Sequence, residues 1–346
     1  MVKRTWSGIS QPLNVFLMFA VFLDLAGLVW AQGSPASDSV PLYRDVTAKA
    51  GIKFQHINGS PDRKDYIFEA KGGGVGLLDY DNDGWLDILI VQGSTLQRVG
   101  DAALHSVLYR NQRDGTFVDV TDKAGLNYSH WGMGVASGDY DNDGDVDIYM
   151  THLGPNVLYR NNADGTFTDV TRMAGVGVPH WSTSAAFGDY DRDGDLDLYV
   201  AGYLDYGPNS LPPKTADCTY LGQPVLCGPR GLRGAPDVLF RNEGNGTFTD
   251  VTESAGVGAQ GLFGMGVAVG DYDNDGFPDL FVAGYDRCIL YRNNGKGAFT
   301  DVTARAKVEN RGLWASSAAW FDYDNDGRLD LVIANYVDWT PKINYY

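Results

Sequence analysis

The sequence is poor in several residue types on which common chemistries depend. Among its 346 residues it has three cysteines, five histidines, and 27 basic against 44 acidic side chains. The net charge of −17 argues against nucleic acid or an anionic membrane as a partner, because both are negatively charged. The sequence contains no nucleophile motif, glycine-rich phosphate loop or zinc-ligand spacing. It therefore predicts a protein that is not an enzyme.

The most informative feature present is a nine-residue acidic pattern, Asp-Tyr-Asp-x-Asp-Gly-x-x-Asp. It occurs five times, beginning at Asp79, Asp139, Asp189, Asp271 and Asp322. Each copy has carboxylates at positions 1, 3, 5 and 9 and a glycine at position 6, which permits a sharp bend. Four carboxylates held close together repel one another, so a hard cation is their natural partner, and oxygen-only ligands in a flexible loop favour calcium. A plain hairpin turn rich in Asp, Asn and Gly explains one copy but not the same acidic positions in all five.

We therefore predict one structural Ca²⁺ per loop, bound by the side chains of positions 1, 3, 5 and 9 and the backbone carbonyl of position 7. In chain order these residues are Asp79, Asp81, Asp83, Trp85 and Asp87; Asp139, Asp141, Asp143, Asp145 and Asp147; Asp189, Asp191, Asp193, Asp195 and Asp197; Asp271, Asp273, Asp275, Phe277 and Asp279; and Asp322, Asp324, Asp326, Arg328 and Asp330. The loops are not EF-hands, which carry a glutamate at loop position 12, where loop 1 has Ile90. Loop 3 has Arg192 at position 4 instead of asparagine. We expect this position to face solvent, so the change should not harm the site.

A second signature recurs between the loops and indicates the fold. Leu-Tyr-Arg-Asn at residues 108–111 is followed by Gly-Thr-Phe-Val-Asp-Val-Thr at residues 115–121, and close variants follow the next three loops. With the strands that enter and leave each loop, one unit holds four strands. Repeats of about 40–50 residues with four strands each are typical of propeller blades. The sequence therefore predicts an all-β propeller of four-stranded blades, with a Pro- and Gly-rich insertion at about residues 203–236.

The two ends of the repeat region raise the question of closure. Residues 42–47 match the last strand of a unit with no loop before it, and the fifth unit lacks its outer pair of strands. Either residues 336–346 supply a third strand in a five-bladed ring, or the chain is a truncated propeller of more blades. The missing outer pair favours truncation.

The N-terminus has the features of a secretory signal. Lys3 and Arg4 precede an apolar region at residues 15–30, and Val29 and Ala31 fit a cleavage site. A membrane anchor is the alternative, but the region contains Asp24 and is shorter than the roughly 20 apolar residues that a span requires. We predict a signal peptide at residues 1–31, a propeller at residues 32–346, and a location outside the cell or in the periplasm, with no membrane insertion after cleavage.

An exported location suits the cysteines. Cys218 and Cys227 lie close together within the insertion, where a disulfide can hold a segment with little core of its own. We predict this pairing. Cys288 is left over, as a buried free thiol or as the partner of a cysteine that this chain lacks.

These residues resemble a known family. The loops and the Phe-Thr-Asp-Val-Thr-x-x-Ala-Gly segments are similar to the FG-GAP (VCBS) repeats of integrin-α-type propellers. Residues 72–80, Gly-Gly-Gly-Val-Gly-Leu-Leu-Asp-Tyr, and residues 227–231, Cys-Gly-Pro-Arg-Gly, further resemble the cartilage acidic protein (ASPIC/UnbV) group. The resemblance spans residues 42–346 and implies a secreted, calcium-stabilised, seven-bladed propeller with a binding or adhesion role. The C-terminal ASPIC/UnbV segment of that group is absent from this sequence, so no function located there carries over.

One further set of residues suggests a ligand site. Trp131, Trp181, Phe263 and Trp314 each stand eight residues before a loop, where the first unit has Lys71. These aromatics either form a partial ring that binds a sugar or a cationic group at a channel mouth, or pack between blades. We predict a secreted calcium-binding scaffold whose partner is an extracellular protein or glycan. The alternatives are a lectin-like glycan-binding propeller and a non-catalytic module of an extracellular enzyme.

Overall fold

The computed structural model describes residues 43–338, apart from residues 63, 208, 213, 215–218, 221–222, 225, 227, 230 and 260. The chain divides into Met1–Asp45 and Val46–Tyr346, and the helices and strands described below belong to the second unit. The predicted signal peptide at residues 1–31 and the predicted disulfide partners Cys218 and Cys227 lie outside the described residues. Within the described part of the chain, no helix has the length and apolar character needed to cross a membrane.

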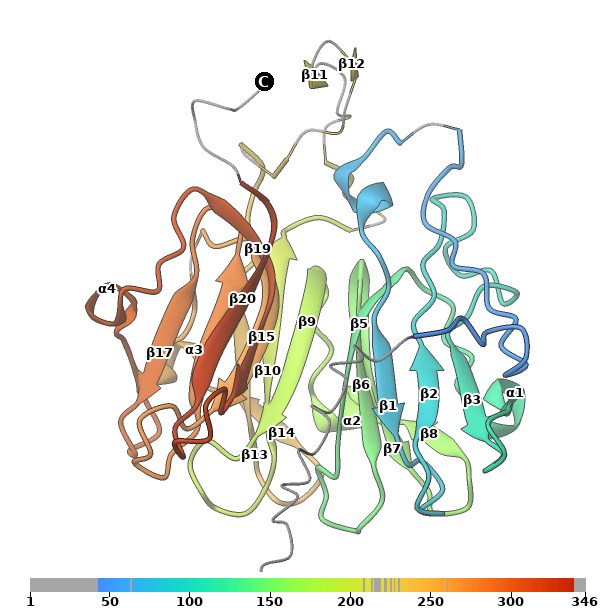
Figure 1. The fold of residues 1–346 in the computed structure, drawn as a ribbon, viewed down its shortest axis with the longest axis horizontal. Helices are drawn as coiled ribbons and strands as arrows, with labels where there is room; N and C mark the ends of the chain where they lie inside the picture. Colours follow the sequence, from blue (N-terminus) through green and yellow to red (C-terminus); the bar gives the residue numbers. More distant parts are fainter. Residues whose placement is uncertain are drawn as a thin grey trace, which may run out of the picture. The chain divides into compact units, whose positions relative to one another are not determined.

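Four-stranded antiparallel sheets are the repeating unit of the fold (Figure 1), which confirms the predicted all-β, blade-based propeller. Blade 1 comprises β1 (Val75–Leu78), β2 (Asp87–Ile90), β3 (Val107–Asn111) and β4 (Phe117–Asp119). Blade 2 comprises β5 (Gly132–Gly138), β6 (Asp147–His152), β7 (Gly154–Asn161) and β8 (Phe167–Asp169). Blade 3 comprises β9 (Trp181–Gly188), β10 (Asp197–Leu204), β13 (Val238–Asn242) and β14 (Phe248–Asp250). Blade 4 comprises β15 (Gly264–Gly270), β16 (Asp279–Gly284), β17 (Ile289–Asn293) and β18 (Phe299–Asp301), and blade 5 is a pair, β19 (Leu313–Phe321) and β20 (Asp330–Asp338). The short strands β11 (Thr219–Tyr220) and β12 (Gln223–Pro224) lie in the insertion between β10 and β13.

A one-turn helix follows the fourth strand of each complete blade. These helices are α1 (Thr121–Ala124), α2 (Thr171–Ala174), α3 (Thr252–Ala255) and α4 (Thr303–Ala306). In blade 1 the Thr121 hydroxyl accepts the Leu108 amide at 3.0 Å and donates to the Asp119 carboxylate at 2.7 Å. Gly125 ends the helix at a φ of 77°, which is strained for other residues. The repeated Asp-Val-Thr-x-x-Ala-Gly sequence therefore ties the outer edge of a blade to its third strand.

Successive blades pack face to face through their first strands. β1 lies beside β5, β5 beside β9, β9 beside β15, and β15 beside β19 (Figure 1). Each interface has its own apolar core, which between blades 1 and 2 includes Tyr80, Leu89, Leu108, Ile148 and Phe167. Burial of these side chains at every interface is the main source of stability, at about 1.5–3 kcal/mol for each large apolar side chain.

Glycines just before loops 2, 3 and 4 allow the blades to approach this closely. A Cβ atom added to Gly188 would lie 2.9 Å from Val269 Cγ1, and one added to Gly270 would lie 2.9 Å from Trp320 Cδ1. Non-bonded carbon atoms essentially never lie closer than 3.0 Å in proteins. A side chain larger than glycine at these two positions would therefore clash with the next blade.

The strand predicted at residues 42–47 is not found where the structure describes it. Residues 43–46 have no strand conformation, and Tyr43 is 98% exposed. A strand needs ladder hydrogen bonds to a neighbour, and the described strand pairs offer none to this segment. Instead the Ala50 amide donates to the Val46 carbonyl at 2.7 Å, as the Ala124 amide does to Val120 in α1. At the other end, residues 339–346 lie outside the described residues, so the two alternatives for closure stay untested.

Candidate metal sites in the acidic loops

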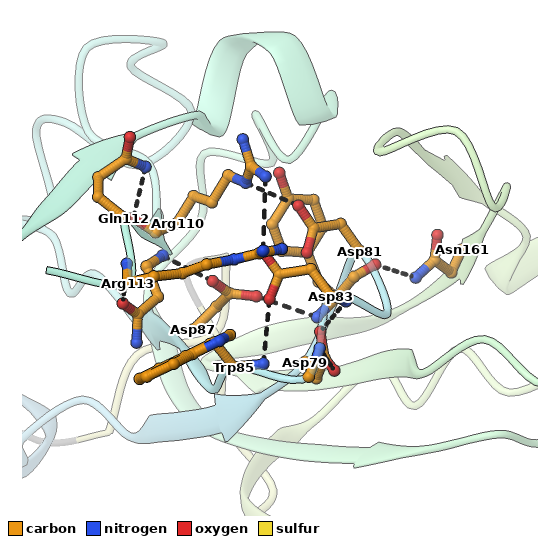
Figure 2. Close-up of polar contacts among 12 residues, drawn as sticks. Asp79, Asp81, Asp83, Trp85, Asp87, Arg110, Gln112, Arg113 and Asn161 are labelled. Atoms are coloured by element: carbon orange, nitrogen blue, oxygen red, sulfur yellow. Dashed lines mark hydrogen bonds and ion pairs between the residues drawn. The ribbon is translucent and has the colours of Figure 1, made fainter.

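Each acidic loop joins the first strand of a blade to the second, and its own carboxylates fix its shape (Figure 2). In loop 1, residues 79–87, the two oxygens of Asp79 accept the amides of Asp83 at 3.0 Å and Gly84 at 2.8 Å. Asp83 Oδ1 accepts the amide of Trp85 at 3.0 Å. Gly84 has a φ of 84°, which favours glycine at position 6. The first two bonds recur in the other four loops.

In loops 1 to 4 the position-9 carboxylate is buried and anchors the loop to the rest of its blade. Asp87 is 0% exposed, and its two oxygens accept the amides of Tyr80 at 3.1 Å and Asn111 at 2.7 Å. The same pair of bonds forms at Asp147, Asp197 and Asp279. Burial raises the pKa of each of these three carboxyls to about 7. A bound cation would offset this effect, because it favours the charged form.

Three carboxylates converge in every loop. Oxygens of positions 1, 3 and 9 lie within 4.8 Å of one another and could hold a metal ion. The groups are Asp79, Asp81 and Asp87; Asp139, Asp141 and Asp147; Asp189, Asp191 and Asp197; Asp271, Asp273 and Asp279; and Asp322, Asp324 and Asp330. The position-5 carboxylates, which we also predicted as ligands, are not part of these groups. One oxygen of each instead accepts the amide of position 7.

The position-3 side chain gives the clearest indication that a cation fits these loops. The Oδ1 atoms of Asp81, Asp141 and Asp191 are buried and have no hydrogen-bond partner in the structure. Burial raises the pKa of the Asp141 and Asp191 carboxyls, and the neighbouring loop carboxylates raise it further. A buried carboxylate oxygen without a partner is unfavourable. The all-oxygen donor set of these loops therefore fits a hard cation such as Ca²⁺.

Two residues of the Leu-Tyr-Arg-Asn strand also belong to the site, and their roles were missed from the sequence. Arg110 Nε lies 2.7 Å from Asp81 Oδ2, and in blade 4 Arg292 Nη2 lies 2.7 Å from Asp275 Oδ2. The asparagine that follows the arginine donates its backbone amide to the position-9 carboxylate, as described above for Asn111. Both residues recur in the strand segment that follows each of loops 1 to 4, although the distance from the loop varies, and that recurrence was the available signal.

The prediction that position 4 faces solvent is confirmed, but its side chain also contacts the next loop. Asn82 is exposed, but its side-chain amide donates to the Gly144 carbonyl at 3.2 Å and to Asp145 Oδ1 at 2.8 Å in the next loop. The Arg192 guanidinium lies 5.1 Å from the centre of the Phe277 ring in loop 4. The reason is that packed blades bring consecutive loops together, which the sequence of one loop does not reveal.

The ligand-binding interpretation of the aromatic ring is also corrected. Trp131 and Trp181 are 0% exposed, and Phe68, from the short helix η1 (Ile67–Ala70), makes edge-to-face contacts with both at 5.0 and 6.0 Å. Neither indole is available to stack on a ligand, so both follow the packing alternative, because η1 covers them. The other two predicted members, Phe263 and Trp314, are partly buried.

Lys71 takes the place of the aromatic residue in blade 1. Its Nζ lies 4.8 Å from the centre of the Tyr203 ring and 4.5 Å from that of Trp314. Burial lowers the pKa of the Lys71 ammonium to about 8. These cation–π contacts join blade 1 to blades 3 and 5.

His152, His130 and the described cysteine lie in packed surroundings. His152 is 1% exposed, and burial lowers its pKa to about 3, so it is neutral. His130 stacks on Tyr128 with ring centres 4.1 Å apart. Cys288 is a buried free thiol, which matches the first of the two alternatives stated for it.

Antiparallel sheets that each carry an aspartate-rich loop between their first two strands define the chain as a repeat propeller with candidate metal sites. The family model for the FG-GAP-like repeat matches residues 79–150, 149–200, 225–282 and 271–333. These matches cover well over half of the chain. The protein therefore belongs to the FG-GAP-like repeat family, as its motifs predicted.

Curated relatives have the name predicted from the motifs. The chain is 34% identical over 113 residues to cartilage acidic protein 1 of Xenopus tropicalis, which is 32% of this chain and 17% of the relative. It is 35% identical over 104 residues to the Mus musculus protein of the same name, which is 29% of this chain and 16% of the relative. The match thus spans about a sixth of the length of these relatives.

Solved structures give weaker similarities. An Agrocybe aegerita lectin that recognises non-reducing terminal N-acetylglucosamine matches with a TM-score of 0.29 and 18% identity, over 75% of this chain and 70% of the lectin. A V. cholerae biofilm matrix protein matches with a TM-score of 0.35 and 14% identity, over 80% of this chain and 36% of that protein.

Proposed function

We propose that the protein is a secreted, calcium-stabilised propeller that acts as a non-catalytic binding scaffold. The observation that supports the calcium sites most directly is the convergence of three carboxylates in each loop, with an unpartnered buried oxygen at position 3 in loops 1 to 3. Bound Ca²⁺ supplies the positive charge that these oxygens lack. The position-9 carboxylate then binds the ion and also accepts the backbone amide hydrogen bonds that attach the loop to its blade.

A matched pair of variants in loop 2 tests the calcium sites. Asp141→Asn changes a carboxylate of the convergent group, while Asp145→Asn removes the same charge from a side chain outside it. We expect the first variant to bind one Ca²⁺ fewer per chain by equilibrium dialysis, and the second to bind as many as the unchanged protein. Equal calcium content in all three proteins would contradict the assignment of loop 2.

Secretion is supported by the basic and apolar N-terminal pattern and by the loops themselves, because loops of modest affinity fill where calcium is plentiful. Expression of the whole chain in its host, followed by N-terminal sequencing of the exported protein, tests this part. We expect the exported protein to begin at Gln32. An uncleaved chain retained in the cell membrane would contradict it.

We propose an extracellular protein or glycan as the partner. A lectin-like role is the second candidate, and it is favoured by an open hollow of about 1220 Å³ at blades 3 and 4. Its lining includes Asp250, Glu253, Arg287, Tyr291 and Asp301, which are side chains that can hydrogen-bond sugar hydroxyl groups. A glycan array with Glu253→Ala tests this role, with Asp122→Ala, at the same place in α1, as the control. If Glu253→Ala leaves glycan binding unchanged, this hollow is not the glycan-binding site.

A further inference from the structure

Each acidic loop is joined to the next by the side chain at its fourth position. Asn82 of loop 1 donates to the carbonyl of Gly144 and to the side chain of Asp145 in loop 2, at 3.2 and 2.8 Å. Asn142 of loop 2 makes the same pair of bonds, at 3.2 and 2.7 Å, to the sixth and seventh residues of loop 3. In both cases the acceptors are the carbonyl of position 6 and the side chain of position 7 of the next loop. Position 7 is also the residue whose backbone carbonyl we predict to bind the cation.

A second set of contacts runs in the opposite direction along the row of loops. The side-chain amide of Asn161, in blade 2, donates to the carbonyl of Tyr80 in loop 1 at 2.8 Å. Its backbone amide donates to Asp147 of loop 2 at 2.8 Å. The equivalent asparagines of blades 3 and 4 donate to loops 2 and 3 in the same way, both at 2.7 Å. Neighbouring loops are therefore linked twice.

Loop 3 differs because its fourth residue is Arg192. Its guanidinium lies over the ring of Phe277 at 5.1 Å, and a Cβ added to Gly276 would lie 2.9 Å from its Nη1 atom. The residue at position 7 of the next loop also differs. Loops 2 and 3 have an aspartate there, which accepts from an asparagine amide, whereas loop 4 has Phe277, whose ring contacts the arginine cation. Between loops 4 and 5 the amide link returns, from Asn274 to the carbonyl of Gly327 at 3.1 Å.

We propose that the loops bind cations as two coupled groups, loops 1 to 3 and loops 4 and 5, with Asn82 and Asn142 as positioning residues and Arg192 as the break between the groups. This inference rests on the proposed calcium sites. A cation that orders one loop fixes its fourth residue, which in turn holds the sixth and seventh residues of the next loop in place. Arg192 brings a positive charge to loop 4 instead of an amide, and like charges repel an incoming cation. Loops 3 and 4 keep the Asn293 contact to Tyr190 but lack the position-4 amide link. Binding in loop 3 therefore favours binding in loop 4 less than binding in loop 2 favours binding in loop 3.

Loop 1 offers a selective probe, because it is the one acidic loop in the sequence with a tryptophan, Trp85. Terbium, a trivalent substitute for Ca²⁺, becomes luminescent when a nearby indole is excited. The part of the signal that Trp85→Phe abolishes reports loop 1. We titrate this signal in variants that lose a carboxylate in loop 3, Asp191→Asn, or in loop 4, Asp273→Asn.

Coupling energies between sites typically change affinity by about fivefold or more. We expect Asp191→Asn to weaken terbium binding in loop 1 by about that factor, and Asp273→Asn to weaken it much less. Asn142→Gly, which removes the link but keeps a left-handed backbone accessible, should also weaken it. Asn325→Gly is the matched control: it changes the same position in loop 5, the last acidic loop of the described chain.

Three outcomes are decisive. Unchanged loop 1 affinity in both Asp191→Asn and Asn142→Gly overturns the coupling while leaving the metal sites standing. An equal loss in Asp273→Asn overturns the break at Arg192. No terbium or calcium binding in the unchanged protein contradicts the proposed function itself and the coupling with it.

Discussion

The side-chain amide of Asn161 in blade 2 donates a hydrogen bond to the carbonyl oxygen of Tyr80 in loop 1, at 2.8 Å. The Tyr80 ring itself is 3% exposed and stacks on Phe167 of blade 2, with ring centres 6.2 Å apart. Loop conformation and blade packing are thus set by the same residues. Cation binding and stability of the fold should consequently be difficult to separate.

Loss of the position-9 carboxylate should be more damaging than loss of the position-5 carboxylate, even without metal. Asp147→Ala removes the acceptor of two amides, those of Tyr140 and Asn161, and each unsatisfied buried group is penalised by about 1–3 kcal/mol. Asp143 is exposed, so Asp143→Ala should change the free energy of unfolding little in EDTA. Urea unfolding of both variants in EDTA makes the comparison. Equal destabilisation would show that the hydrogen bonds from the two backbone amides to Asp147 contribute little to stability.

Truncation of the buried tryptophans should destabilise the protein strongly. Trp131→Ala and Trp181→Ala each leave a large cavity beneath η1, and such changes lower the free energy of unfolding by about 3–5 kcal/mol. Trp85 is 48% exposed, so Trp85→Ala serves as the control and should shift stability by about 0.5 kcal/mol or less. Thermal melting of the three variants gives the order. Near-native stability of both buried-site variants would restore the binding-ring interpretation.

The sequence was sufficient to predict the blades because their determinants are local. The Asp-Tyr-Asp-x-Asp-Gly loop needs a left-handed glycine such as Gly84, and the Thr121 hydroxyl closes its turn on a neighbour two residues away. These requirements act within one repeat, so they leave a repeated pattern. The convergence of positions 1, 3 and 9 also follows from the local turn.

Features that depend on neighbouring blades could not be predicted in the same way. The bonds of Asn82 to loop 2, and the burial of Trp131 under Phe68, involve residues more than 60 positions apart in the sequence. The sequence also did not distinguish position 5, which lies outside the convergent group, from position 3, because both are aspartates in the same alternating pattern. In the structure, one oxygen of Asp83 accepts the amide of Trp85.

The glycines at the blade interfaces should not tolerate a side chain. Gly188→Ala places a methyl group 2.9 Å from Val269 Cγ1, and such overpacking typically lowers stability by about 1–3 kcal/mol. Gly207→Ala is the control, because nothing lies within 4 Å of a Cβ there. Guanidinium unfolding of the two variants measures the difference. If both behave alike, close blade contact at Gly188 is not required.

The pH dependence of stability should change sign when calcium is removed. Without metal, the Asp147, Asp197 and Asp279 carboxyls have a folded-state pKa of about 7, against roughly 3.9 when unfolded. The folded state then binds more protons, so stability should fall as pH rises from about 4 to about 7. With calcium, stability should rise with pH instead, because the ligands must lose their protons to bind the ion. Urea unfolding at several pH values, in EDTA and in calcium, tests this, and parallel profiles would contradict it.

Thermal unfolding in EDTA and in calcium tests the central claim most directly. At a free concentration about ten times the dissociation constant, each site adds roughly 1.4 kcal/mol, and five sites together add on the order of 7 kcal/mol, which is comparable to the total stability of a typical domain. We predict that EDTA lowers the melting temperature by about ten degrees or more, that calcium restores it, and that magnesium restores it poorly. Melting curves that superimpose in EDTA and in calcium would contradict a calcium-stabilised propeller.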